Sequence, residues 1–515
     1  MRPHRFIPVF LLLGLVSCKS VEQEPVYEPA VRLELQEVSA YRATFSVKTI
    51  DAASVVYGVG ASETPELEHE IPTGSIKPSD LSFSVGDLSP GTDYRIRLRG
   101  VGPGGEEGNI QTLDFRTLNG PAQLYAWERA RTSRPSFADI SLITLGKHNY
   151  NPPVWTKDRF ASHVQYTDQN GKSHWLFESF LCIDGFDGDR GLSYCIANGR
   201  QSAIRESWED LLEAWLGDDG ALRKLDEAIT DAVAVLGTPA RPHYIVMSLP
   251  DPIRFQFFDD KTSSTTYWGE LDGRRLDFSR VEDQQAAYRW YADRCRSRFN
   301  ILNFKNLELA GFYILSEELP LSPDFFQKCG KPFDSADTWN WQYKRWEQLV
   351  PWVSDYAHSC NEGLWWIPYH LAPGYRVWEE LGFDAAFMQP NRYWDNGSNQ
   401  HPMNKTVDAI KRYRLGMELE FEYSMVANVM KDGRAGPDGS GNPAFYIKDV
   451  PMLRDRLREY FAGYKESGLY GVIPLAVYSG TDAFHQLAIS QENDDIAMYH
   501  ELCRFIIDSP LRTTH

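Results

Sequence analysis

The first patterned stretch of the chain, residues 28–119, alternates apolar and polar side chains along short segments. This alternation is present at 31–35, 43–47, 55–59, 81–85 and 94–98. Successive side chains of a strand point to opposite faces of its sheet, so the alternation predicts strands that each bury one face. Short strands at this spacing, separated by turns, predict a small all-β sandwich.

The pattern changes between residues 123 and 512, where short apolar runs alternate with longer stretches of helical periodicity. The apolar runs are 140–145, 175–183, 244–249, 309–315, 364–369, 385–389, 417–423 and 472–478. Strands that alternate with helices predict a parallel sheet. Eight such runs fit an α/β (β/α)8 TIM-type barrel with long loops. A doubly wound open sheet is the alternative, although no glycine-rich first turn supports it.

One segment of the predicted sandwich carries a family resemblance. Residues 88–98 read Leu-Ser-Pro-Gly-Thr-Asp-Tyr-Arg-Ile-Arg-Leu, and Phe-Arg-Thr follows at 115–117. This segment resembles the fibronectin type III family. The resemblance implies that Tyr94 forms a corner tying the penultimate strand to the loop before it, with 115–117 in the closing strand. Such a domain spaces or presents a neighbour, and we assign it no chemistry.

Composition and charge narrow the function classes. The chain has 515 residues and is 42% hydrophobic, so it is long enough for more than one domain and apolar enough to build a core. It carries 53 Lys and Arg against 71 Asp and Glu, a formal net charge of −18. An acidic surface repels phosphate backbones, which argues against nucleic acid as a partner.

The N-terminus has the features of an export signal. A basic start, Met-Arg-Pro-His-Arg, precedes the apolar run 6–16, which ends in Leu-Val-Ser-Cys at 15–18. This resembles a bacterial lipobox, and the resemblance implies a signal peptide over 1–18, a lipid on Cys18 and a tether over 19–27. Lys19, rather than Asp, favours sorting to the outer membrane, with the periplasmic and surface faces both open. An ordinary signal peptide with an incidental cysteine is the alternative.

The remaining cysteines give no sign of a zinc site. They lie at positions 182, 195, 295, 329, 360 and 503, with no CxxC or HExxH spacing. Export permits disulfides, and Cys182 with Cys195 is the most plausible local pair, although buried free thiols are equally plausible. We expect no cofactor. Two loops offer weak calcium ligands, namely Asp184, Asp187 and Asp189 in one and Asp432, Asp438 and Asn442 in the other.

Carboxylates follow the fourth and seventh apolar runs. Run four ends in Ser-Glu-Glu at 316–318, and run seven reads Gly-Met-Glu-Leu-Glu-Phe-Glu-Tyr at 416–423. Aligning Gly311 with Gly416 places Glu317 level with Glu422. In a TIM-type barrel the active site lies at the carboxyl ends of the strands, and strands four and seven face each other across the mouth.

Two carboxyl groups at one mouth suit the cleavage of glycosidic bonds. One group protonates the departing oxygen, and the other attacks the anomeric carbon or activates water. We take Glu317 and Glu422 as the first catalytic candidates, with Glu318 and Glu420 as candidates for swapped roles. Glu418 lies deepest in the strand and is interpreted as structural. The alternative for Glu418, Glu420 and Glu422 is a structural network in which they pair with inward Arg or Lys.

The layout is similar to a large clan of barrel glycosidases with carboxylates on strands four and seven. The match is by position, because Ser316 stands where that clan has Asn before the strand-four Glu. Over residues 123–512 the sequence also resembles a family of Bacteroidetes lipoproteins with a barrel domain of unknown function. That resemblance implies a role in polysaccharide use without supplying a reaction.

Polar and aromatic residues at the predicted strand ends are candidate sugar contacts. Sugar rings present apolar C–H faces that stack on aromatic side chains, and hydroxyls need polar partners. The candidates are His148, Asn149, Asp251, Tyr369, His370, Asn391, Arg392, Tyr393, Trp394 and Tyr478. Tyr393 and Trp394 lie in a polar loop and are expected to face ligand. Arg392 could hold a uronate or sulfate, or pair with Asp395.

Three functional hypotheses follow from these observations. The first is a lipid-anchored glycoside hydrolase that acts on a polysaccharide or oligosaccharide. The second is a non-catalytic glycan-binding lipoprotein whose acids only bind hydroxyls. The third is a structural or adhesion protein whose barrel performs no chemistry. The paired carboxylates favour the first hypothesis, and the absence of Asn before Glu317 favours the second.

Overall fold

The computed structural model describes residues 27–38, 43–61, 63–73, 76–85, 88–89, 91–117, 135, 137–145, 154–196, 200–333, 337, 345–395, 399–428, 449–480 and 482–512. These residues fall into two compact units that divide after Asn119. Each unit has its own hydrophobic core.

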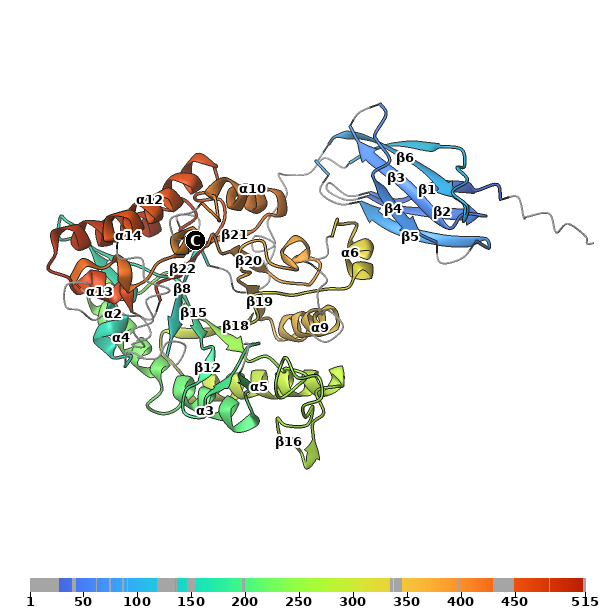
Figure 1. The fold of residues 1–515 in the computed structure, drawn as a ribbon. Coiled ribbons are helices and arrows are strands. Elements are labelled where there is room, and N and C mark those ends of the chain that lie inside the picture. The colour runs from blue at the N-terminus through green and yellow to red at the C-terminus, as the bar shows by residue number, and fades with distance from the viewer. Residues whose placement is uncertain are drawn as a thin grey trace, which may run out of the picture. The chain divides into compact units, whose positions relative to one another are not determined.

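The N-terminal unit is a sandwich of two antiparallel sheets (Figure 1). One sheet contains β1 (Ala30–Val38), β2 (Ala43–Ile50) and β5 (Ser79–Val85). The other contains β4 (His69–Pro72), β3 (Ser54–Gly60), β6 (Asp93–Val101) and β7 (Gln111–Arg116). Phe45 and Phe83 pair across β2 and β5 and are buried between the sheets. The sandwich predicted from the alternation is confirmed.

Tyr94 forms the corner that the fibronectin type III resemblance implies. Its hydroxyl accepts a hydrogen bond from the backbone N–H of Ser89 at 2.8 Å, which ties β6 to the loop before it. Its ring stacks on Phe115 of β7, with the centroids 5.7 Å apart.

The second unit is built on a closed barrel of eight parallel strands (Figure 1). In ring order the strands are β8 (Asp139–Thr144), β11 (Ser179–Ile183), β15 (His243–Leu249), β18 (Leu307–Ile314), β19 (Gly363–Trp366), β20 (Ala385–Met388), β21 (Gly416–Glu420) and β22 (Leu475–Tyr478). β22 pairs with β8 and closes the ring. Each strand overlaps one of the eight apolar runs, so the predicted barrel is confirmed and the open-sheet alternative is wrong.

Helices cover the outside of the barrel (Figure 1). They are α2 (Lys157–Val164), α3 (Arg205–Leu216), α4 (Ala221–Leu236), α5 (Val281–Leu302), α6 (Pro323–Cys329), α9 (Trp346–Ser359), α10 (Met403–Tyr413), α12 (Val450–Glu466), α13 (Ala483–Ile489) and α14 (Asn493–Ile507). Each amphipathic helix buries one stripe, as α4 does with Leu222, Leu225 and Ile229. No helix in the described part of the chain has the length and apolar character needed to cross a bilayer.

Short elements lie in the loops that connect the barrel strands. The short strands are β9 (Gln165–Thr167), β10 (Ser173–Trp175), β12 (Phe186–Asp187), β13 (Leu192–Ser193), β14 (Gln201–Ser202), β16 (Glu270–Leu271) and β17 (Arg274–Arg275). Single 3-10 turns are η1 (Tyr375–Val377), η2 (Arg392–Trp394) and η3 (Tyr423–Met425). Two of these turns, η2 and η3, follow β20 and β21, where the predicted site residues are concentrated.

The amino ends of β8 and β11 meet at an ion-paired floor. Arg512 Nε lies 2.9 Å from Asp139 Oδ2 and 3.6 Å from Glu178 Oε1. The N–H of Glu178 donates to Asp139 Oδ1 at 2.8 Å. Burial raises the pKa of Asp139 to about 7, and the charge of Arg512 opposes that rise. The guanidinium therefore compensates a carboxylate that is only 1% exposed.

The predicted Cys182–Cys195 pair is wrong. All six described cysteines are free thiols. Cys182 is buried within β11 and interacts electrostatically with Cys295, whereas Cys195 interacts with Asp251 and Glu317. The two thiols therefore lie in different surroundings, because the chain folds into β12 and β13 between them.

Candidate active site

Glu317 lies at the mouth of the barrel, three residues beyond the end of β18. It is exposed to solvent, and the side-chain amide of Gln389, which follows β20, donates to its Oε1 at 3.0 Å. Desolvation by the surrounding protein raises the pKa of Glu317, and the charge of Glu318 adds to the rise against the Gln389 hydrogen bond. Glu317 is thus an accessible carboxyl group whose neutral form is favoured.

Glu420 is the last residue of β21 and is only 2% exposed. Its Oε2 accepts hydrogen bonds from the backbone N–H of Asn391 at 2.7 Å and from the Tyr460 hydroxyl at 3.2 Å. Burial raises the pKa of Glu420 to about 8, and the charge of Glu317 contributes. Hydrogen bonds to its charged form, including one from the Trp394 side chain, oppose the rise.

Glu418 completes a group of interacting acids that we call the carboxylate cluster, namely Glu317, Glu418 and Glu420. Glu418 is 2% exposed, and burial raises its pKa well above the usual range, with the charges of Glu420 and Glu317 adding to the rise. Among the described residues none of the three forms an ion pair with Lys, Arg or His. Acids that interact this closely share their protons and titrate together. For Glu418 and Glu420, the alternative of pairing with an inward Arg or Lys is therefore wrong within the described part of the chain.

Glu422 lies on the side of the mouth formed by β22. It caps the turn η3, is 6% exposed and packs against Gly480, where an added Cβ would lie 2.9 Å from the Glu422 carboxyl carbon. Its charge raises the pKa of Tyr478, after the larger effect of burial. Within β21, the charge of Glu317 raises the pKa of both Glu418 and Glu420.

Aromatic side chains surround the carboxylate cluster. Tyr369 is 40% exposed, and its backbone N–H donates to the carbonyl of Glu317 at 3.2 Å. Burial raises the pKa of Tyr369, and the charges of Glu420 and Glu317 raise it further. Tyr478 and Trp394 are half-buried near the same acids. These rings offer faces on which a sugar could stack.

The comparisons with known proteins give a family for the barrel. A family model described as "Domain of unknown function (DUF4855)" matches residues 139–331 and 333–435, which include β8 to β21 and the whole carboxylate cluster. The chain belongs to the DUF4855 family. No curated protein matches this chain.

Solved structures match the N-terminal sandwich of this DUF4855 protein. One is the sensor domain of the anti-sigma factor RsgI4 of Pseudobacteroides cellulosolvens, at 17% identity, with 19% of this chain and 100% of that chain covered and a TM-score of 0.15. Another is the sixth fibronectin type III domain of a human fibronectin type III domain containing protein, at 20% identity, with 19% and 89% covered and a TM-score of 0.15. At these scores the likeness carries no argument about function.

Two sequence-predicted sugar contacts of the DUF4855 protein are placed differently from expectation. Tyr393 is 1% exposed, its N–H donates to the Tyr460 hydroxyl at 2.7 Å, and its own hydroxyl donates to the carbonyl of Glu422. The expectation that Tyr393 faces ligand is therefore wrong, because its ring supports the mouth from inside the core. Arg392 pairs with Glu459 at 2.9 Å and with Asp395 at 3.1 Å, which selects the second of its two predicted roles.

His370 and Asp251, two further predicted sugar contacts, each have contacts of their own within the barrel unit. Burial lowers the pKa of His370 to about 4, the neighbouring His401 lowers it further, and Thr406 lies 3.4 Å from its Nδ1. These contacts fit a neutral, structural imidazole. Asp251 is 4% exposed at the end of β15, and its backbone N–H donates to the carbonyl of Tyr194 at 2.7 Å. Glu318 is half-buried beside Glu317.

Asn391 has a role that its sequence position alone does not reveal. Its backbone lies in the left-handed region with φ of 56°, which turns its N–H toward Glu420. It is 5% exposed, and its side-chain Nδ2 has no hydrogen-bond partner among the described residues. A strained backbone beside an unused buried donor is a feature of functional sites.

Several predicted residues lie outside the described part of the chain, namely Cys18, His148, Asn149, Asp432, Asp438 and Asn442. In the other candidate calcium loop, Asp187 Oδ1 accepts from the backbone N–H groups of Asp189 and Arg190, each at 3.1 Å. Its Oδ2 pairs with the Arg190 guanidinium at 2.8 Å, so this carboxylate organises the turn. The described residues contain no group of three His, Cys, Asp or Glu that could hold a metal ion.

Proposed function

We propose that this DUF4855 protein is a glycoside hydrolase in which Glu317 and Glu420 are the catalytic carboxyl groups. The observation that carries the proposal is an uncompensated carboxylate cluster at a barrel mouth, with one exposed member. β18 and β21 are the fourth and seventh strands of the ring, so Glu317 and Glu420 approach the mouth from different walls. Unpaired buried acids are costly, and a catalytic role explains their presence.

The environments of the two groups suggest different roles. Glu317 reaches solvent and has a raised pKa, so it suits the general acid that protonates the departing oxygen. Glu420 accepts hydrogen bonds from Asn391, Tyr460 and Trp394, and these contacts hold its carboxyl group in one orientation. Once it has lost its proton, this carboxylate suits attack on the anomeric carbon or activation of water, so the activity in this role should rise as the pH approaches 8. The distance between the two groups in the substrate complex decides between retention and inversion.

A non-catalytic glycan-binding protein is the second candidate function. It is favoured by the 2% exposure of Glu420, which limits direct contact with a sugar in this conformation, and by Ser316 before Glu317. In that case Tyr369, Trp394 and Tyr478 would still hold sugar rings by stacking. The two candidates differ in whether product is released.

The test is release of reducing sugar from a panel of polysaccharides and oligosaccharides. We expect the wild type to cleave at least one glycan, and Glu317→Gln and Glu420→Gln each to lose roughly 10³-fold or more of that activity. Glu308→Gln is the matched control. Glu308 lies on β18, the strand that leads to Glu317, but it is exposed and lies near the amino end of that strand. Binding without cleavage would support the second candidate. Full activity in both mouth variants would overturn the assignment of these residues.

We also propose that the protein is exported and anchored to the outer membrane through a lipid on Cys18, with a glycan as its partner. The proposal is supported by the basic start, the apolar run 6–16 and the cysteine that ends it. In a bacterial host, the wild type should take up labelled fatty acid and sediment with membranes. Cys18→Ala should take up none. Equal labelling of both proteins would contradict the proposal.

A further inference from the structure

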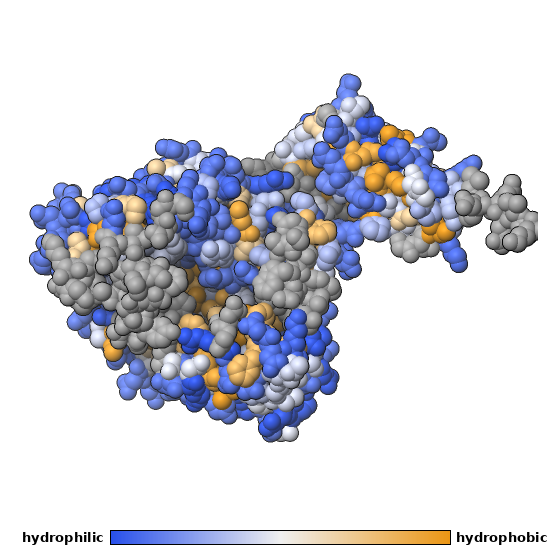
Figure 2. Space-filling model, in the orientation of Figure 1, coloured by the Kyte–Doolittle hydropathy of each residue, from blue (hydrophilic) through white to orange (hydrophobic). Residues whose placement is uncertain are grey.

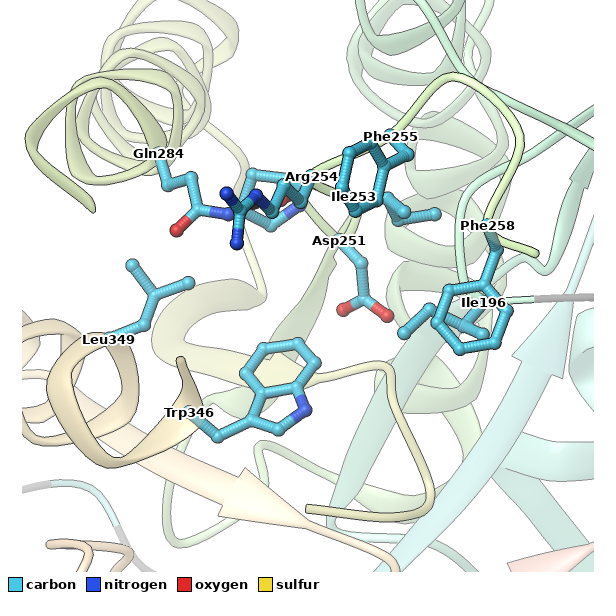
Figure 3. Close-up of a pocket in the computed structure, with 10 residues that line it drawn as sticks. Ile196, Asp251, Ile253, Arg254, Phe255, Phe258, Gln284, Trp346 and Leu349 are labelled. Atoms are coloured by element: carbon cyan, nitrogen blue, oxygen red, sulfur yellow. Dashed lines mark hydrogen bonds between the residues drawn. The ribbon is translucent and has the colours of Figure 1, made fainter. Parts of the chain in front are cut away.

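A second cavity lies next to the carboxylate cluster, between the loop that follows β15 and the start of α9 (Figure 3). Its lining residues include Ile196, Asp251, Phe255, Phe258, Gln284 and Trp346. Cys195 interacts electrostatically with both Asp251 and Glu317, and Tyr313 does the same, so this cavity and the mouth are neighbours.

Most of the cavity wall is apolar, but four polar side chains interrupt it, namely Trp346, Gln284, Asp251 and Arg254. Trp346 is 3% exposed and its indole Nε1 has no hydrogen-bond partner among the described residues. Gln284 is 2% exposed; its amide nitrogen donates to the carbonyl of Pro252 at 2.9 Å, while its Oε1 has no partner within the described part. The other two are the Asp251 carboxylate, which interacts with Tyr288, and the Arg254 guanidinium. Figure 3 shows this carboxylate and the Trp346 indole nitrogen turned toward the same space.

Unused buried donors and acceptors carry a free-energy cost that a suitable ligand removes. The cavity therefore calls for a small group with one acceptor for the Trp346 indole N–H, one donor for Gln284 Oε1, and an apolar end. The whole hollow measures about 370 Å³ including its open side, and only a small part of it is wide enough for a water molecule. That space suits a side group rather than a whole sugar ring.

We infer that this cavity receives the acetamido group of an N-acetylated sugar whose ring lies at the barrel mouth. The acetamido carbonyl accepts from the Trp346 indole N–H, and the acetamido N–H donates to Gln284 Oε1. Its methyl group packs among Ile196, Phe255 and Phe258. A purely apolar group would leave the indole N–H unsatisfied, which is unfavourable in a buried site. The inference rests on the proposed glycan site and names the class of sugar that this site selects.

Apolar side chains are also exposed within a hollow on the face of the barrel unit seen in the space-filling view (Figure 2). The Arg254 guanidinium in the cavity wall attracts negative charge, so the preference for an N-acetylated sugar rests on the partnerless Trp346 and Gln284 atoms and on the apolar wall.

Binding of N-acetylglucosamine, N-acetylgalactosamine, glucosamine and glucose to the full chain tests the inference. Saturation-transfer NMR should show the acetyl methyl protons as the strongest contacts, and calorimetry should show tighter binding of the N-acetylated sugars. Trp346→Phe keeps the aromatic ring but removes the N–H, so it should weaken binding of N-acetylated sugars roughly five- to tenfold and leave glucose binding unchanged. Trp352→Phe is the control, because Trp352 lies on the same helix and stacks on Tyr356.

The outcomes separate this inference from the proposed function. Selective binding of N-acetylated sugars without hydrolysis of any glycan would support the acetamido site and overturn the hydrolase. Hydrolysis of glycans that lack N-acetyl groups, with no preference among the four sugars, would overturn the acetamido site alone. Equal effects of Trp346→Phe and Trp352→Phe would also overturn it, since the weaker binding would then not depend on the Trp346 indole N–H.

Discussion

The two ends of the barrel bury acids in opposite ways. At the floor, Asp139 and Glu178 share the guanidinium of Arg512, which lies 2.9 Å from the first. At the mouth, the carboxylate cluster has no described cationic partner, and its acids raise one another's pKa. At the floor, the Arg512 guanidinium therefore neutralises buried negative charge, whereas at the mouth the buried acids have no such partner, which is unfavourable. Burial of this kind is retained where it performs chemistry, which is why the mouth and not the floor is the candidate active site.

The largest expected effect on stability comes from removing the floor cation. Arg512→Gln leaves the buried Asp139 carboxylate without its ion pair and removes the hydrogen bond from Arg512 to the Trp175 carbonyl. Unfolding by urea should show a loss of roughly 3–5 kcal/mol. Activity per folded molecule should not change, because the floor is remote from the chemistry.

The exposed pair Arg504 and Asp508 provides the control for the floor. Arg504→Gln should change stability by less than about 1 kcal/mol. If Arg512→Gln instead reduced activity while leaving stability intact, the division between a structural floor and a catalytic mouth would be wrong.

A smaller effect of opposite sign is expected at the mouth. The pKa of Glu420 rises from 4.5 to about 8 on folding, so the folded state holds a proton that the unfolded chain has released. Stability from this group is fully present below pH 4.5 and is lost as the pH rises toward 8. Glu420→Gln should therefore be more stable than the wild type by roughly 1–3 kcal/mol at pH 8 and similar to it at pH 4.5.

Urea unfolding of both proteins across this pH range measures the effect. A Glu420→Gln variant that loses stability at pH 8 would show that the ionised carboxylate is compensated after all, and the contrast between floor and mouth would fail.

The smallest expected effect is a shift in the pH–rate profile. Glu418 lies beneath Glu420 in β21, and its charge interacts with Glu420 and Glu317. Glu418→Gln removes one like charge, so the apparent pKa values of the remaining pair should fall by about half a unit to one unit. The rate of hydrolysis measured against pH should move to lower pH, with the maximal rate reduced far less than in Glu420→Gln. An unmoved profile would place Glu418 outside the cluster.

The sequence predicts the barrel well because its signal is local. Parallel barrel strands are buried on both faces, so each appears as a continuous apolar run, and all eight runs become strands. The period-two spacing of Glu418 and Glu420 likewise predicts that both share one face of their strand. The sandwich corner at Tyr94 follows from a local motif in the same way.

The details of the site depend on contacts between distant segments, which local patterns do not encode. The positive φ of Asn391 and the donation from Gln389 to Glu317 become visible only in the folded chain. Tyr393 shows the reverse case, because its polar neighbours in sequence predict exposure while α12 buries it through Tyr460. The cavity at Trp346 escapes prediction for the same reason, since its walls come from separated loops and helices.

The most direct measurement compares Glu317→Gln with the wild type on aryl glycosides whose leaving groups differ in acidity. If Glu317 donates the proton, the variant should lose roughly 10³-fold on a glycan or a poor leaving group. It should lose less than about tenfold on a dinitrophenyl glycoside, whose leaving group departs without a proton. Equal losses on both substrates, or no loss on either, would contradict the account of Glu317 as the general acid of the mouth.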